Sequence, residues 1–426
     1  MTIAIMVYLN IEGEKVNLEY FIAKRVQSST SYKNSVSAPI IKIAIAAIAI
    51  GIIVMLIAIA TGVGLQKKIK EKVSAFNGHV SISLYDRNNS VTTVKPISKE
   101  QGFYPDFTKV PEVTHIQAIA TKGGMIRTAT DFEGIILKGV GTDYDWQYLQ
   151  DFLIEGELPK LNKEDTSFDI LISDDIAARL QLKVGDQAST YFMKANGQEP
   201  IARFFTVSGI YDSGLEEYDS KFIIGDIKHI QRINKWDESQ VGKFEVFIND
   251  FDKLNEIGRN IQLNTPSELN AKTIEQELPA IFQWLALLDG NIFGIIGIIL
   301  IVGIINMITA LLVLILDRTN MIGVLKSLGA SNWTVRKIFL YNAMNLVFKG
   351  LVIGNVIGLG LIGIQYFFSP LTLDPQSYHV TEMPVYISWW HVVALNLGTF
   401  VVCLLALIIP TFIVSKISPV KAMRFE

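Results

Sequence analysis

The sequence predicts a membrane protein with four transmembrane α-helices, one followed by three, and a large α+β extracytoplasmic domain between spans one and two. The 426 residues are 50% hydrophobic and only 19% charged, and the mean hydropathy is +0.34. Soluble chains carry about 25% charged residues. Four long stretches are almost free of charge, and the segment between the first two mixes strand and helix patterns.

Each apolar stretch is long enough to cross a bilayer, because a hydrocarbon core of about 30 Å needs about 20 helical residues. The first exceeds the apolar region of a signal peptide, about 7–15 residues, so we expect it to remain as an anchor. The predicted order is a cytoplasmic N-terminal segment at 1–38, a transmembrane helix at 39–65, a periplasmic α+β domain at 66–289, a second span at 290–316, a cytoplasmic helix and loop at 317–337, a third span at 338–369, a periplasmic loop at 370–388, a fourth span at 389–415 and a cytoplasmic tail at 416–426.

Basic residues indicate the orientation. Lys and Arg occur before span one, between spans two and three and after span four, whereas the loop at 370–388 has none. Cytoplasmic loops carry the excess of Lys and Arg. We therefore expect both termini and the 317–337 loop in the cytoplasm, and the segment 66–289 outside.

The large external segment alternates strand and helix signals. Strand patterns are predicted at 79–85, 113–120, 124–129, 134–140, 168–172, 187–192, 201–210, 221–224 and 244–248, with helices at 173–180, 225–234 and 251–262. Ser173 is placed to cap the first of these helices. Residues 66–76 are predicted to continue the first span as a helix that ends at Asn77-Gly78. Residues 271–278 are predicted to lead back to the membrane.

No catalytic chemistry is predicted in this segment. The sequence has no His-Glu-x-x-His and no Gly-x-Ser-x-Gly motif. The five histidines lack metal-ligand spacing, and the single cysteine, Cys403, excludes an intramolecular disulfide. The acidic pairs Asp143/Asp145 and Asp174/Asp175 are expected to be turn and N-cap acids. A net charge of −3 argues against nucleic acid as a partner.

Small and polar residues inside the spans indicate helix packing. Gly350, Gly354 and Gly358 recur every four residues, a spacing that lets helices approach closely. Gly290, Gly294 and Gly297 are expected to act similarly in span two. Asn306 and Asn355 are expected to hydrogen-bond between helices. Lys349 is either a functional intramembrane charge or a side chain that snorkels to the interface.

The 317–337 loop contains a short amphipathic helix. Met321, Val324, Leu325 and Leu328 follow the i, i+3, i+4, i+7 spacing of one apolar stripe. Gly329 ends this helix, and Ser331 can cap the next. The stripe must be buried in lipid headgroups or in a partner protein, and periodicity does not distinguish the two.

Three motifs carry a resemblance to a known family. The loop RTNMIGVLKSLGASNWTVRKIF, the tail ISPVKAMRFE (417–426) and FNGHVSI after span one resemble the permease family of the lipoprotein-releasing permeases, the MacB-type efflux permeases and the FtsX cell-division protein. The FNGHVSI motif is closest to the lipoprotein-releasing branch. The order of one span, an external domain and three spans is similar as well, whereas residues 1–16 match nothing in the family pattern.

The resemblance implies a bacterial inner-membrane permease subunit that is not itself an enzyme. The chain has no P-loop, so ATP and Mg²⁺ would be bound by a separate ABC ATPase and no cofactor by this chain. A second permease chain, identical or paralogous, would complete the transporter. The residues implied to contact the ATPase are Met321, Ile322, Val324, Leu325, Lys326, Leu328, Gly329 and Ala330.

The resemblance also implies mechanotransmission, in which ATPase closure moves spans one and two and a lipoprotein is extracted from the outer leaflet, with a periplasmic lipoprotein carrier as a further partner. The alternatives are efflux of peptides or small toxic compounds, or FtsX-like regulation of an envelope hydrolase. Spans one and two are uncharged and rich in Ile, Met and Phe. We therefore expect their outer ends to contact the lipid anchor, through Met55, Ile59, Val63, Phe293 and Ile296.

Overall fold

The computed structural model describes residues 18–28, 37–85, 95–194, 199–373, 380 and 382–416. The chain divides into two compact units. The membrane unit contains residues up to 65, 286–371 and 383 onward, and the external domain contains 66–285 and 372–382. The motif at 417–426 and residues 1–16 lie outside the described residues. The predicted fold class, four apolar helices and a large α+β domain between the first two, is confirmed.

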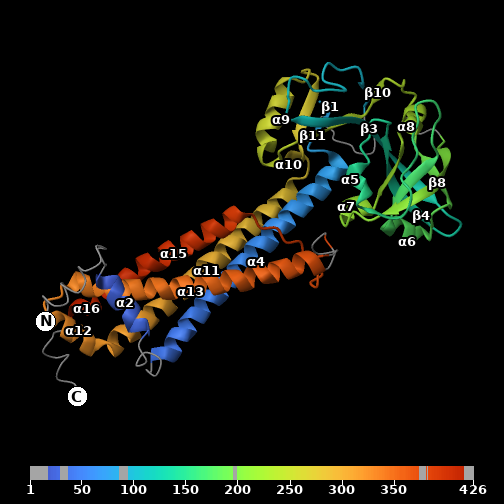
Figure 1. The fold of residues 1–426 in the computed structure, drawn as a ribbon. Helices are drawn as coiled ribbons and strands as arrows, with labels where there is room; N and C mark the ends of the chain where they lie inside the picture. The colour runs from blue at the N-terminus through green and yellow to red at the C-terminus, as the bar shows by residue number, and fades with distance from the viewer. Residues whose placement is uncertain are drawn as a thin grey trace. The chain divides into compact units, whose positions relative to one another are not determined.

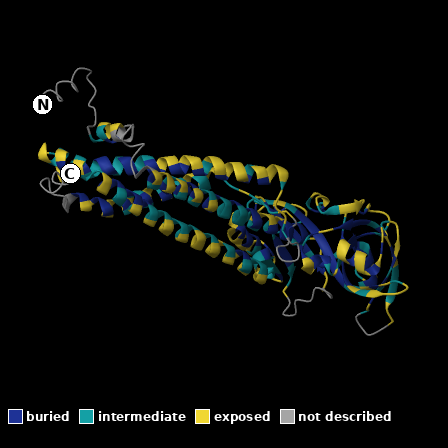
Figure 2. Cartoon of the chain, turned by 90° about the horizontal axis from the view of Figure 1, so that it is seen from below, coloured by how far each residue is buried: buried dark blue, intermediate teal, exposed yellow. Residues whose placement is uncertain are grey.

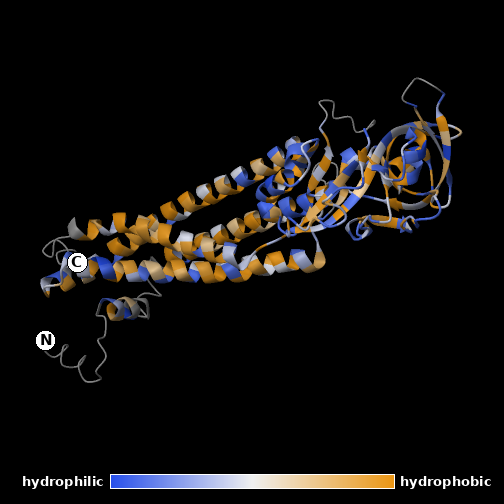
Figure 3. Cartoon of the chain, turned by 90° about the horizontal axis from the view of Figure 1, so that it is seen from above, coloured by the Kyte–Doolittle hydropathy of each residue, from blue (hydrophilic) through white to orange (hydrophobic). Residues whose placement is uncertain are grey.

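Among the described residues, the membrane unit contains four long helices, two of which extend into the external domain, and three short ones (Figure 1). The long helices are α4 (Ser37–Asn77), α11 (Pro279–Asp317), α13 (Asn332–Phe368) and α15 (Trp389–Thr411), and the short ones are α2 (Leu18–Ser28), α12 (Thr319–Ser327) and α16 (Ile413–Lys416). Apolar residues cover the long helices on most faces (Figure 3). A helix makes its backbone hydrogen bonds within itself, as a segment inside a bilayer must. Long helices with apolar side chains on most faces therefore fit a membrane environment.

Glycines set the closest approach between two of these helices. A Cβ on Gly350 would lie 2.7 Å from Ile48 Cβ, and one on Gly354 would lie 2.8 Å from the carbonyl oxygen of Ala49. At Gly358 the nearest atom is 2.9 Å away, on Leu56. The α13 backbone therefore lies against α4 along this row, where any side chain would force the helices apart.

The second glycine series behaves differently. A Cβ added to Gly290, Gly294 or Gly297 would have no atom within 4 Å. The expectation that these glycines bring helices together is therefore wrong within this chain. In Figure 2 the outer faces of the long helices are largely exposed, and these three glycines lie on the loosely packed part of α11.

Amide side chains supply the polar contacts between helices. Asn355 of α13 and Asn396 of α15 exchange two hydrogen bonds, at 2.6 and 2.9 Å, which confirms the interhelical role expected for Asn355. Gln365 accepts a bond from the Leu371 N–H and donates to the carbonyls of Leu371 and Met383. The Tyr386 N–H donates to the Ala60 carbonyl at 2.9 Å. This bond fixes the segment just before α15 to α4.

The external domain is built on a ten-stranded sheet with the order β12-β1-β11-β3-β4-β9-β6-β8-β5, in which β7 pairs with β3 and β8. The strands are β1 (Val80–Leu84), β3 (Val113–Arg127), β4 (Phe132–Val140), β5 (Leu153–Gly156), β6 (Asp169–Ser173), β7 (Gln187–Phe192), β8 (Ile201–Tyr211), β9 (Phe222–Asp226), β11 (Lys243–Ile248) and β12 (Leu269–Thr273), and β2 (Ile97–Ser98) pairs separately with β10 (Gln240–Val241). Among the described strand pairs, only β4–β9 and β6–β8 are parallel.

Short helices fill the connections between strands. They are α5 (Gln147–Gln150), α6 (Asp174–Leu180), α7 (Glu216–Asp219), α8 (Ile227–Asn234), η1 (Phe251–Lys253), α9 (Leu254–Leu263) and α10 (Ile274–Glu277). The Ser173 hydroxyl accepts from the Ile176 N–H at 3.1 Å, so the predicted cap of α6 is confirmed. Strand β1 lies between β11 and β12, with Val80 opposite both Val246 and Thr273.

Candidate functional site

The short helix α12 presents two faces. Ile322 is fully buried, and Met321 and Leu325 pack against the core of the membrane unit. On the opposite side Val324 is 49% exposed and Leu328 is 63% exposed, with Asn320 and Ser327 also exposed between them. Residues 320, 324, 327 and 328 follow helical spacing. The exposed face of α12, as we call this set, is therefore a continuous strip.

The sequence predicts a single stripe of Met321, Val324, Leu325 and Leu328. The structure divides it, because the apolar arc is wider than one contact and its inner half holds α12 on the membrane unit. Ile322 marks this inner half, since it lies beside Met321 and one turn before Leu325 and Lys326. Ile322, an apolar residue next to the predicted stripe, was the feature of the sequence that shows an apolar arc wide enough to have both an inner and an exposed half.

The remaining residues of this loop have internal roles. Lys326 Nζ donates to the Val414 carbonyl at 2.6 Å, so its ammonium is held by α16. Gly329 has φ of +91°, a left-handed conformation that glycine adopts without strain and that ends α12. Ala330 packs against the apolar core. Ser331 accepts from the Thr334 N–H at 3.1 Å and caps α13 as expected.

The cytoplasmic end of α13 is tied to its neighbours. The Arg336 guanidinium lies 4.1 Å from the centre of the Phe412 ring, beyond the end of α15. Lys337 pairs with Glu19 of α2 at 3.5 Å, and Tyr20 and Tyr341 make an edge-on ring contact. These contacts join α2, α13 and the chain after α15.

The residues expected to contact a lipid anchor have different environments. Phe293 is 73% exposed on α11. Ile59 and Ile296 are partly buried against the core, and Val63 is half-buried. Met55 is only 2% exposed. Its side chain is enclosed by the helices of this chain, so the structure leaves four of the five predicted residues accessible.

The external domain shows acidic groups in structural positions. Asp143 accepts hydrogen bonds from the Ala118 N–H at 2.7 Å and the Tyr104 hydroxyl at 3.0 Å. Asp145 accepts from the Gln147 N–H at 3.0 Å, and Asp174 and Asp175 lie in the first turn of α6. The prediction that these acids have structural roles is confirmed, although the N-cap of α6 is Ser173, and Asp174 and Asp175 follow it in the first turn. In the parts of the chain that the structure describes, no His, Cys, Asp and Glu group could hold a metal ion.

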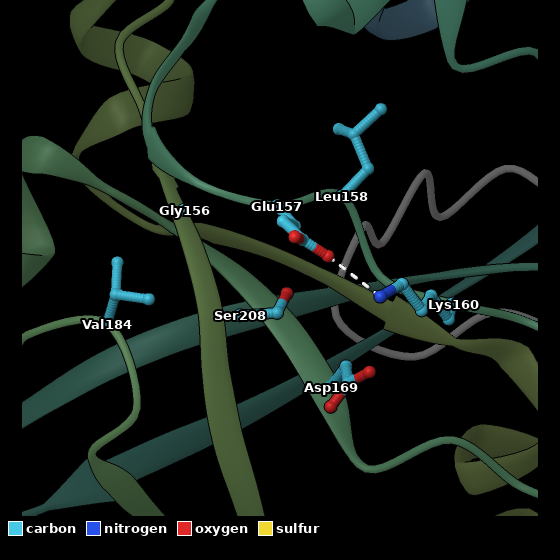
Figure 4. Close-up of a pocket in the computed structure, with 7 residues that line it drawn as sticks. All are labelled: Gly156, Glu157, Leu158, Lys160, Asp169, Val184 and Ser208. Atoms are coloured by element: carbon cyan, nitrogen blue, oxygen red, sulfur yellow. Dashed lines mark ion pairs between the residues drawn. The ribbon is translucent and has the colours of Figure 1, made fainter.

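An open pocket of about 370 Å³ lies beside β5 and β8 (Figure 4). Its polar lining includes Asp169, Ser208 and an ion pair between Lys160 and Glu157, 2.8 Å apart. Both members of that pair are largely exposed, at 82% and 74%. None of its polar lining residues is buried, and its apolar side chains are only Leu158 and Val184, so the pocket presents no developed binding chemistry.

Comparison with known proteins identifies the family. The MacB-like periplasmic core domain family matches residues 43–281, which is more than half of the 426 residues. The FtsX-like permease C-terminal family matches residues 293–419. The chain belongs to the FtsX/MacB-like permease family. The predicted membership of this family is confirmed. Together with the four apolar helices, it supports a multi-pass protein of a bacterial inner membrane.

Individual relatives of this FtsX/MacB-like permease carry lipoprotein-release names. The lipoprotein-releasing system transmembrane protein LolC of Haemophilus influenzae is 23% identical over 266 residues, covering 61% of this chain and 65% of that protein. LolC of Xylella fastidiosa is 22% identical over 383 residues, or 85% and 88% of the two chains. LolE of Haemophilus influenzae is 21% identical over 421 residues, or 96% and 99%. The permease family implies an ABC ATPase and a second permease chain as partners.

Proposed function

We propose that this chain is the permease subunit of an ATP-driven ABC transporter that extracts lipoproteins from the outer leaflet of the inner membrane by mechanotransmission. The observation that carries the proposal is the similarity to LolE, which extends over 96% of this chain and 99% of that protein. Both termini and α12 lie in the cytoplasm in this proposal, because the loops next to them carry the Lys and Arg residues.

The exposed face of α12 is the proposed contact with the ATPase. Val324 and Leu328 are large apolar side chains exposed beyond the bilayer, and burying each is worth roughly 1.5–3 kcal/mol. A helix that lies on lipid usually carries several Lys or Arg on the polar face that flanks its apolar face, whereas Lys326 is bonded to the Val414 carbonyl. ATP and Mg²⁺ are bound by the ATPase, and this chain supplies no catalytic group.

The test replaces one residue from each face of α12. Leu328→Asp removes an exposed contact, so co-purification with the ATPase should weaken at least tenfold, which corresponds to about 1.4 kcal/mol, while the permease still inserts. Leu325→Asp places a carboxylate against the core of the membrane unit and should instead lower the yield of folded permease. Undiminished co-purification of Leu328→Asp would contradict the assignment.

The lipid anchor is proposed to contact the outer parts of α4 and α11. The accessible members of the predicted set are Ile59, Val63, Phe293 and Ile296. Each buried CH₂ of an acyl chain contributes about 0.8 kcal/mol, so a charge there should exclude the anchor. Phe293→Asp should reduce lipoprotein release without changing ATPase binding. Val356→Asp is the matched control, because Val356 is 70% exposed on α13.

A transport assay separates the alternatives. The complete transporter contains this chain, a second permease chain that is identical or paralogous, and the ATPase, and it passes lipoprotein to a periplasmic carrier. Reconstituted in proteoliposomes, it should release a fluorescent lipoprotein to that carrier when ATP is added. Export of a peptide or a small toxic compound without lipoprotein release would favour the efflux alternative. Activation of an envelope hydrolase without any transport would favour the FtsX-like alternative.

A further inference from the structure

The ten-stranded sheet of the external domain has two terminal strands, and they differ in regularity. The strand order ends at β12 on one side and at β5 on the other; in Figure 1, α9 marks the β12 end of the domain. Strand β12 pairs with β1 over five consecutive residues without a shift of register, whereas β5 has four residues and a bulge in its pairing with β8. A regular edge is a template for another strand, and a short, bulged one is not. The β12 edge is therefore the one that needs protection.

A side-chain amide occupies the outer edge of β12. The Ala271 N–H donates to Gln262 Oε1 at 2.6 Å, and Gln262 Nε2 donates to the Leu269 carbonyl at 3.4 Å. A glutamine amide carries an acceptor and a donor on one planar group, as a peptide unit does. Gln262 therefore makes the two hydrogen bonds that a neighbouring strand would otherwise make at this point.

The other outward backbone groups of β12 are held by local contacts. Alternate residues of an antiparallel strand direct their backbone groups to opposite sides, so Leu269, Ala271 and Thr273 share the outer edge. The Leu269 N–H donates to the Pro266 carbonyl at 2.9 Å, within a turn. The Thr273 N–H donates to Gln276 Oε1 at 3.2 Å, as part of the capping box of α10. Only the amide from α9 acts at the centre of the edge.

Helix α9 places this amide at the border of the solvent. Gly258, one turn before Gln262, lies against β12, since a Cβ there would be 2.5 Å from the Thr273 methyl group. Gln262 and Ala271 are both half-buried, so water could bond the same backbone groups if the amide were removed. Satisfying those groups does not require Gln262. What the amide excludes is another strand.

We propose that Gln262 closes the β12 edge against strand addition by a second copy of this chain. The edge is self-complementary: two antiparallel copies centred on Ala271 would place Leu269 of each opposite Thr273 of the other. Anchoring in one membrane holds such copies at high effective concentration, with their external domains on the same side. An open edge would join the two sheets, whereas the closed edge keeps the domains separate. This role does not depend on the transported substrate.

The test uses the full chain in proteoliposomes and a thiol on β12. Lys272→Cys supplies the thiol, and the native Cys403 is buried. In the self-paired edge the two introduced thiols would be diagonal neighbours, about 7–8 Å apart, within reach of a short bis-maleimide reagent. Gln262→Met opens the edge, because it keeps the length of the side chain and removes both hydrogen bonds.

We expect Lys272→Cys/Gln262→Met to cross-link at least about tenfold more than Lys272→Cys alone, which corresponds to about 1.4 kcal/mol of pairing free energy. Lys160→Cys is the control for random encounters, because the Lys160 side chain is 82% exposed in the same domain. Its cross-linking should be equal with and without Gln262→Met.

Two further substitutions should suppress the cross-link. Adding Ala271→Pro to Lys272→Cys/Gln262→Met removes the central outward N–H, and proline is tolerated at such an edge position. Gln262→Glu in place of Gln262→Met retains an acceptor for the Ala271 N–H and puts a charge on the edge, which disfavours pairing.

Equal cross-linking of Lys272→Cys with and without Gln262→Met, in folded chains, would overturn the inference. A cross-link that persists after Ala271→Pro would also overturn it, because the copies would then associate elsewhere. Gln262→Ala is the second variant, for the case in which Gln262→Met does not fold, and it should open the edge in the same way. Loss of folding in both would overturn the inference as well, because the amide would then be required by the fold itself.

Discussion

In the membrane unit, helices pack closely where a glycine leaves room for the neighbouring helix, whereas the sheet of the external domain buries charged side chains. Gly350 and Gly354 lie against Ile48 and Ala49 of α4. Among the described residues, the buried charged side chains all lie in the external domain: Lys72, Lys122, Lys138, Asp219, Asp226 and Glu245. Shape therefore holds the helices, where lipid supplies no hydrophobic driving force, while the sheet can hold charge because its interior offers polar partners.

The largest expected effect comes from breaking one buried pair. Glu245→Leu leaves the Lys138 ammonium, 4% exposed, without its carboxylate, and such a change costs about 3–5 kcal/mol. The full chain in detergent should unfold at a much lower denaturant concentration. Glu157→Leu, at an exposed ion pair, is the control and should unfold like the native chain. Equal stability of the two variants would contradict the role of enclosed charge.

The membrane unit should respond to shape instead. Gly354→Leu forces a side chain toward the Ala49 carbonyl, 2.8 Å from the new Cβ, and overpacking against backbone costs about 3 kcal/mol. Gly294→Leu adds the same side chain where no atom lies within 4 Å. Folded yield and thermal stability of each chain expressed alone should fall only for Gly354→Leu. Similar losses in both would show that local contact does not explain the glycine row.

Acid should weaken the external domain first. Burial lowers the pKa of His79 to about 4, and its Nδ1 accepts from the Ile248 N–H at 3.2 Å. Because the folded pKa lies below the unfolded value, this stability is complete above about pH 6.5 and is lost as the pH falls toward 4. The loss should reach about 2 kcal/mol at pH 5.

The control for this titration is His79→Asn, whose side-chain oxygen can accept the Ile248 N–H without binding a proton. Unfolding of the external domain, followed by hydrogen exchange in β1 and β11, should become less sensitive to pH between 6.5 and 4. A residual dependence is expected, because burial also lowers the pKa of His229. An unaltered pH profile would exclude His79 as the main titrating group.

The smallest effect is expected where the membrane unit relies on polar contact. Asn396→Leu removes both amide bonds to Asn355, and interhelical hydrogen bonds in membrane proteins average about 0.6 kcal/mol. The unfolding midpoint should therefore shift far less than for Gly354→Leu. A larger shift for Asn396→Leu would mean that hydrogen bonding, rather than shape, dominates this unit.

The membrane helices could be predicted because length and lack of charge decide them locally. Parts of the external domain could not. The sequence predicts separate strands at 113–120 and 124–129, but β3 is continuous from Val113 to Arg127. Gly124 does not interrupt this strand. The glycine instead leaves room for the Phe192 ring, which a Cβ at this position would approach to 2.7 Å. A glycine in a strand often marks such an approach rather than a break.

Long-range pairing explains two further differences. The sequence predicts that residues 271–278 lead back to the membrane, yet Leu269–Thr273 forms β12 because it pairs with β1, far away in sequence. The strand Leu153–Gly156 was likewise missed, and it exists through pairing with β8. For the candidate site, the sequence identified the amphipathic loop helix. It did not show which half of the apolar arc faces inward, because that depends on the neighbouring helices.

The pairing of β1 with β12 has a consequence for the history of this architecture. Val80, just after α4, lies directly opposite Thr273, just before α10. The chain therefore enters and leaves the sheet at neighbouring positions, about 5 Å apart. A module whose two ends meet can be inserted into a host chain with little disturbance.

A segment exchanged between related permeases has to include the end of α4, because Phe76 packs against Tyr211 and Tyr218. Chimaeras that exchange residues 66–285, whose ends are joined by the hydrogen bond from Gln66 to the Leu285 carbonyl, should therefore fold, and external specificity can be inherited independently of the membrane helices.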